Sequence, residues 1–146
     1  MNRTRDKLTE HLGPLTTTPI PRPHTGWIRA SREALGMNAT QLARQLGINK
    51  SGIGRLEEAE RTGSIKLDTL RRAAEAMDCS LVYAIVPNGT YEDIVGERAR
   101  SAADTAVAQT LHAMTLENQT PDTGAAERIR AQAVDDLIRR GEVWDH

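Results

Sequence analysis

The chain has 146 residues, of which 38% are hydrophobic and only 3% aromatic, with no phenylalanine. A core of aliphatic side chains and methionine indicates modest packed helices in one compact domain with extensions, and it argues against a large enzyme core. The formal net charge is −1, and the single cysteine, Cys79, excludes an internal disulfide framework and fits a reducing compartment.

The charged residues are distributed unevenly. Residues 22–72 contain ten Lys and Arg against five Asp and Glu, whereas residues 73–146 contain six against thirteen. Either the first segment faces phosphate and the second has another task, or both are ordinary solvated surfaces. No apolar run approaches the roughly 20 residues of a membrane span, and the N-terminus lacks the apolar core of a signal peptide. We therefore expect a cytoplasmic protein without a membrane partner.

Residues 1–25 are expected to form an N-terminal arm. A short helix over residues 5–12 should end at Gly13, and four prolines should then keep the chain extended as far as Thr25: Pro14, Pro19, Pro21 and Pro23. This segment is an extension and does not amount to a domain.

Residues 26–87 carry the signals of a domain of four short helices. The first and fourth helices are expected over 26–35 and about 67–77. Asn38 can cap the second helix, with Gln41 completing a capping box three residues later, and Gly47 closes it. The third helix begins after Asn49, which is another favourable N-cap residue.

An apolar, β-branched run follows at residues 80–86 and ends at Pro87, Asn88 and Gly89. It predicts one short strand that is either buried on both faces or in need of a partner. Because one strand cannot make a sheet, the partner would be the N-terminal arm or the same strand of a second subunit.

Two helices rich in alanine are expected in residues 88–146, over about 90–117 and 124–140, with Gly141 ending the second. They either pack on their own domain or offer a dimerisation or partner-binding surface. The predicted fold is therefore all-α: a helix-turn-helix bundle with one short strand and two C-terminal helices.

The residues from Ala39 to Leu56 have the spacing of a helix-turn-helix. Ala43 must be small because the next helix crosses close to it, and Gly47 lies where the turn requires a positive φ. Five apolar residues would fix the crossing angle of the two helices: Leu42, Leu46, Ile48, Ile53 and Leu56.

In a helix-turn-helix, the N-terminal residues of the second of the two helices, here the helix after Asn49, enter the major groove of DNA. Lys50 and Arg55 can donate to guanine O6 and N7, and Ser51 can pair with several base edges. Thr40 and Gln41, at the start of the preceding helix, are expected to bind the phosphate backbone, and so is Arg61 after the recognition helix. The predicted DNA-binding residues are Thr40, Gln41, Asn49, Lys50, Ser51, Gly52, Arg55 and Arg61.

Three further features of this region have open or limited interpretations. Gly52 and Gly54 each cost the helix about 1 kcal/mol relative to alanine, which either close approach to DNA or close packing on the preceding helix would explain. Arg22 belongs either to a minor-groove arm or to a plain linker. Three acidic residues at the far end of the helix stay away from phosphate if the helix inserts by its N-terminus: Glu57, Glu58 and Glu60.

These residues resemble the lambda-repressor-like (Xre-type) helix-turn-helix family, whose recognition helix is similar to NKSGIGRLE. Over residues 26–100 the segments GWIRASREALGMNATQLARQLGI and LEEAERTGSIKLDTLRRAAEAMDCSLVYAIVP resemble the family called mobile mystery protein A. Genes of that family typically lie beside one that encodes a Fic-domain protein, so the resemblance implies an antitoxin or autoregulator. Xre-type proteins commonly have Gln where this chain has Ala39, which removes one contact unless Gln41 replaces it.

The sequence favours a homodimeric transcriptional regulator that binds an operator in double-stranded DNA, an autorepressor and antitoxin paired with a Fic-domain toxin. Two alternatives remain: an antitoxin that neutralises its toxin mainly through the C-terminal helices, and a phage-type repressor without a toxin. We do not expect an enzyme, a metal site or a cofactor, because the four histidines are scattered and no glycine-rich phosphate loop is present.

Overall fold

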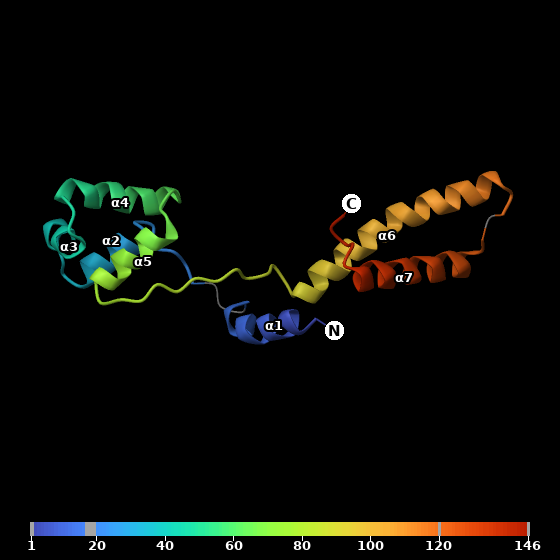
Figure 1. Ribbon diagram of the computed structural model, residues 1–146, viewed down its shortest axis with the longest axis horizontal. Coiled ribbons are helices and arrows are strands. Elements are labelled where there is room, and N and C mark those ends of the chain that lie inside the picture. The colour runs from blue at the N-terminus through green and yellow to red at the C-terminus, as the bar shows by residue number, and fades with distance from the viewer. Residues whose placement is uncertain (1, 17–19, 120, 146) are drawn as a thin grey trace. The chain divides into compact units, whose positions relative to one another are not determined.

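The computed structural model describes residues 2–16, 20–119 and 121–145 (Figure 1). Within these residues all regular secondary structure is α-helical, in seven helices, which confirms the predicted all-α fold class. The chain divides into two compact units, one of residues 19–85 and one of residues 1–18 with 86–146. No helix of the described residues is long and apolar enough to cross a membrane.

The unit of residues 19–85 consists of four short helices: α2 (Trp27–Ala34), α3 (Ala39–Leu46), α4 (Lys50–Thr62) and α5 (Leu67–Ala76). All four helices contribute to its core, and Met77 follows directly after α5. The buried core residues are Ile28, Leu42, Ala43, Ile53, Ala73 and Met77. Burial of each large aliphatic side chain stabilises the fold by about 1.5–3 kcal/mol, which allows so few residues to hold four helices.

The predicted start and end of α3 are confirmed. The Asn38 side chain accepts a hydrogen bond from the Gln41 N–H, and the Gln41 side chain accepts one from the Asn38 N–H, each at 2.8 Å. Gly47 ends α3 with φ 67°, a left-handed conformation that glycine adopts without strain. Asn49 occupies the N-cap position of α4, as predicted, although its side chain makes no capping hydrogen bond.

The other unit contains α1 (Arg3–Thr16), α6 (Tyr91–Leu116) and α7 (Thr123–Arg140). The helices α6 and α7 lie side by side as a hairpin (Figure 1). Three residues of α6 at four-residue spacing are buried: Ala99, Ala103 and Val107. Gly141 ends α7 with φ 73°, as its sequence position predicts, and Val143 beyond it is buried.

The first helix is longer than the sequence predicts. It continues past Gly13 and Pro14 to Thr16, so the expectation that these residues stop it is wrong. Pro14 lies in the last turn, where its missing N–H group removes at most one intrahelical hydrogen bond. Residues 17–19 of the predicted extended segment lie outside the described residues.

Residues 80–86 do not form the predicted strand. They carry no regular secondary structure, and three of their apolar side chains are largely exposed: Val82 at 84%, Tyr83 at 65% and Ile85 at 85%. A β-ladder needs a second strand, and the described residues of the chain contain none. The expectation of a strand buried on both faces is therefore wrong for the single chain, and the described residues of the N-terminal arm form no strand that could pair with it.

Candidate nucleic-acid interface

The inward face of α4 fixes this helix on the rest of its unit. Ile53 is only 1% exposed and packs in the core with Leu42 and Ala43. One turn later, the Glu57 carboxylate accepts a hydrogen bond from Nε of Arg32 on α2 at 2.7 Å, and both side chains are largely buried. Arg32 also donates to the carbonyl oxygen of Met37, so one guanidinium joins α2, α4 and the turn before α3.

Glu60, near the end of α4, is the buried acidic residue of the unit. Its carboxylate accepts hydrogen bonds from the backbone N–H groups of Trp27 at 2.7 Å and Ile28 at 3.1 Å. These are the first amides of α2, which have no partner within their own helix, so a side chain from α4 caps α2. Gly26 makes room for this cap, because a Cβ there would lie 2.5 Å from Oε2 of Glu60.

Arg22 forms hydrogen bonds at the C-terminal end of α4. Its Nη2 donates to the carbonyl oxygens of Arg61 at 2.6 Å and Glu60 at 3.4 Å. A cation suits the end of a helix, where carbonyl groups carry partial negative charge. The guanidinium that was considered for a minor-groove contact therefore stabilises the end of α4 in this structure.

The outward face of α4 presents most of the predicted DNA-binding residues. Asn49, Lys50 and Ser51 lie exposed at its first turn, and Arg55 is exposed one turn after Ser51. These side chains are close enough to contact one stretch of DNA because residues four apart are neighbours on a helix surface. Gly52 is half-buried and lies toward the side of α4 that packs on the protein.

The predicted phosphate contacts at the start of α3 are partly occupied. Thr40 is exposed at the first turn. Gln41 is also exposed, but its N–H group and its side-chain oxygen both serve the capping box with Asn38. The donors left at this helix end are therefore the earlier amides, the Thr40 hydroxyl and the amide nitrogen of the Gln41 side chain.

Arg61 lies at the other end of α4 and pairs with Glu58 on the same helix. Its Nη2 lies 2.6 Å from Oε1 of Glu58, and its Nε donates to Oε2 at 3.0 Å. The hydrogen bond to this carboxylate raises the pKa of Arg61. The cation predicted to contact the DNA backbone is thus half-exposed and already balanced by a carboxylate.

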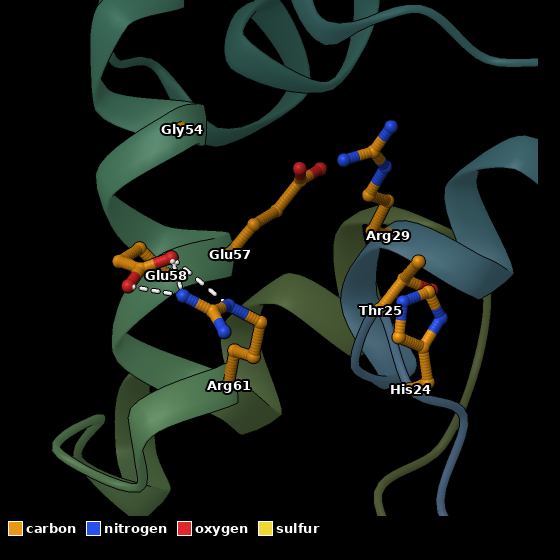
Figure 2. Close-up of a pocket in the computed structure, with 7 residues that line it drawn as sticks. All are labelled: His24, Thr25, Arg29, Gly54, Glu57, Glu58 and Arg61. Carbon is orange, nitrogen blue, oxygen red and sulfur yellow. Dashed lines mark hydrogen bonds and ion pairs between the residues drawn. The ribbon is translucent and has the colours of Figure 1, made fainter.

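A surface hollow of about 520 Å³ lies between α4 and the start of α2 (Figure 2). The cations at this hollow are balanced as well: Arg29 pairs with Glu33 at 2.8 Å, which raises the pKa of Arg29 and lowers the pKa of Glu33. The lining residues are His24, Thr25, Arg29, Gly54, Glu57, Glu58 and Arg61. Within the described part of the chain, no group of three His, Cys, Asp or Glu residues could hold a metal ion.

Most of the unit of residues 19–85 is similar to a known protein family. Residues 28–83 match the family described as Helix-turn-helix. The match begins in α2 and extends beyond α5, so it spans α3, the turn after it, α4 and the whole core of this unit. No curated protein and no solved structure matches the chain.

The helix-turn-helix match supports a DNA-binding transcription regulator of the lambda-repressor-like type. It does not extend to the closer resemblance to mobile mystery protein A, which stays a prediction. The match covers only the helix-turn-helix unit, and it leaves α1, α6 and α7 without an assigned role.

Several contacts that hold the helix-turn-helix unit in shape were not predicted from the sequence. The Glu58 and Arg61 pair has an i,i+3 spacing, so the sequence does contain a signal for it. The bonds from Glu60 to α2 and from Arg22 to α4 join residues more than thirty positions apart, and no local pattern indicates them. The three acidic residues near the C-terminal end of α4 therefore all have a hydrogen-bond or ion-pair partner within the unit: Glu57, Glu58 and Glu60.

Proposed function

We propose that the protein is a repressor that inserts the N-terminal turn of α4 into the major groove of an operator near its own promoter. The main observation in its favour is that α4 has one face packed against the protein and one face exposed to solvent. On the packed face, the side chains contact other parts of the same unit: Ile53, Glu57 and Glu60. On the exposed face lie hydrogen-bond donors, at the end of the helix that this motif presents to DNA: Lys50, Ser51 and Arg55.

The pairing of the acidic side chains supports this orientation. Glu57 and Glu60 point into the unit, and Glu58 is balanced by Arg61, so the carboxylates of α4 oppose the phosphate backbone less than their number suggests. Lys50 and Arg55 have no acidic partner among the ion pairs of the described residues. The favourable charge therefore lies at the N-terminal half of the helix, where the bases would be contacted.

A homodimer is the second part of the proposal. One recognition helix covers too few base pairs for useful specificity, whereas two helices related by a twofold axis bind half-sites about 34 Å apart. The exposed apolar segment 80–86 suits pairing with the same segment of a second copy. We accordingly expect an inverted repeat as operator, bound in the cytoplasm.

Footprinting on the DNA upstream of the gene tests the proposal. We expect two protected stretches about one helical turn apart, which appear together as the protein concentration rises. A scrambled fragment of equal length and base composition serves as control. Failure to protect any site at low salt and micromolar protein would contradict the proposed function.

We also propose an antitoxin role, with the α6–α7 unit binding a Fic-domain toxin encoded by a neighbouring gene. In its favour, this unit exposes large apolar side chains, with Leu116 at 74% and Trp144 at 60%. The acidic balance of residues 73–146 would favour a partner with a basic surface. Co-purification with the Fic-domain protein tests this role, and a Leu116→Asp variant should weaken the complex without affecting DNA binding.

A further inference from the structure

Two glycines lie inside α4, and the structure separates the reasons for them. A Cβ on Gly52 would lie 3.2 Å from Cδ1 of Ile48, so packing against the turn before α4 accounts for the missing side chain. A Cβ on Gly54 would have no neighbouring heavy atom within 4 Å. Because glycine disfavours a helix interior, and the packing of the chain does not require it at position 54, a contact made outside the folded unit would be a sufficient reason for it.

The position of Gly54 indicates where that reason lies. Gly54 is exposed, one turn after Lys50 and Ser51 and one turn before Glu58 on the outward face of α4. It borders the hollow of about 520 Å³ whose opposite wall includes His24, Thr25 and Arg29 (Figure 2). The bare backbone at Gly54 keeps this part of α4 open to a large ligand.

We infer that Gly54 is a specificity-determining position, at which the edges of operator base pairs come into contact with the backbone of α4. This inference rests on the proposed function. When the first turn of α4 lies in the major groove, the next residue on the same face also lies against the base edges. A methyl group at Gly54 would occupy space that a base edge or a thymine methyl group needs, and it would hold the whole helix away from the groove.

The charges around Gly54 favour base edges over phosphate as the contact. Arg29 is paired with Glu33 and Arg61 with Glu58, and the Glu57 carboxylate is paired with Arg32. Both arginines that line the hollow already have a carboxylate partner, so the hollow itself offers a phosphate no unpaired arginine. Neutral base edges carry both donors and acceptors and tolerate this mixed surface.

The test uses Gly54→Ala in the full chain, with Gly13→Ala as its matched control. Both glycines lie inside helices with no heavy atom within 4 Å of an added Cβ, but Gly13 belongs to α1 in the other unit. The probe is a duplex that the wild-type protein selects from a random-sequence library. Binding is measured by fluorescence anisotropy and stability by thermal unfolding.

We expect both variants to keep or raise Tm by a few degrees, since alanine favours helix more than glycine does. Gly54→Ala should weaken duplex binding at least tenfold, and Gly54→Leu should weaken it further, while Gly13→Ala should bind as the wild type does. Binding of Gly54→Ala within twofold of the wild type would overturn the inference and leave the proposed function standing. A fall in Tm for Gly54→Ala would also overturn it, because the fold itself would then need the glycine. If the wild type selects no consensus duplex, the proposed function fails first.

Discussion

Lys50 and Arg61 stand at opposite ends of the outward face of α4, and they should contribute to DNA binding in different ways. Lys50→Ala should reduce discrimination between the operator and a variant with one altered base pair by about 1–3 kcal/mol, because a donor to a base edge is lost. Arg61→Ala should weaken all sequences alike and reduce the salt dependence by less than about one charge, because Glu58 already balances part of the Arg61 charge. Titrations of specific and nonspecific duplexes at several salt concentrations measure both effects. Equal, sequence-independent losses from the two variants would refute this division of roles.

Glu60 and Gly26 form a second pair of residues whose roles can be tested. Glu60→Ala leaves the first N–H groups of α2 without their acceptor, and we expect a loss of about 1–3 kcal/mol in the free energy of unfolding. Gly26→Ala should destabilise the unit by a similar amount, since its φ of 85° disfavours a Cβ and the added atom would meet the Glu60 carboxylate.

Glu58→Ala is the matched control for these two variants, because Glu58 lies on the same helix but is exposed. Urea unfolding followed by circular dichroism gives the three free energies. An effect of Glu60→Ala no larger than that of Glu58→Ala would show that the buried cap contributes little to stability.

At the scale of the helices, the two asparagines at the N-termini of α3 and α4 should differ in their contribution. Asn38→Ala removes a capping hydrogen bond and should cost about 1 kcal/mol of stability. Asn49→Ala removes no such bond and should cost less, although both residues hold the N-cap position in an extended conformation. Denaturant unfolding of the two variants side by side checks this order, and equal losses would contradict it.

The accuracy of the sequence predictions depends on how local each signal is. Asn38, Gly47 and Gly141 act through neighbouring residues, and the helix ends that they predict are confirmed. Pro14 was expected to stop a helix, but this proline sits in a last turn that tolerates it. Segment 80–86 has the composition of a strand, yet strand formation requires a partner that sequence alone does not provide.

The candidate site was predicted to a similar extent. The exposed donors at the start of α4 follow from helix periodicity, and the structure places Lys50, Ser51 and Arg55 on its surface. The contacts that hold α4 in position come from Arg22, Arg32 and Glu60, which bond to residues distant in the sequence. Tertiary folding brings these groups together, so their roles become visible only in three dimensions.

At the scale of the whole molecule, the exposed apolar segment 80–86 and the exposed end of α6 are competing surfaces for self-association. If segment 80–86 pairs across a twofold axis, Val82→Asp should lower the dimer fraction at least tenfold, because a carboxylate would be buried without a partner. Leu116→Asp is the control at the end of α6 and should leave the dimer intact. Analytical ultracentrifugation measures both. The opposite pattern would move the dimer interface to the C-terminal unit, and a wild-type monomer at high concentration would exclude the homodimer.

The helix α4 has one face that packs against the rest of its unit and one face that is exposed to solvent, and this separation has an evolutionary consequence. Ile53, Glu57 and Glu60 hold the helix, and none of them is among the residues proposed to contact bases. Substitutions at Lys50, Ser51 and Arg55 can therefore accumulate with small effects on folding. Duplicated copies of such a gene could acquire new target sites, and so separate regulatory circuits, while inheriting the same scaffold.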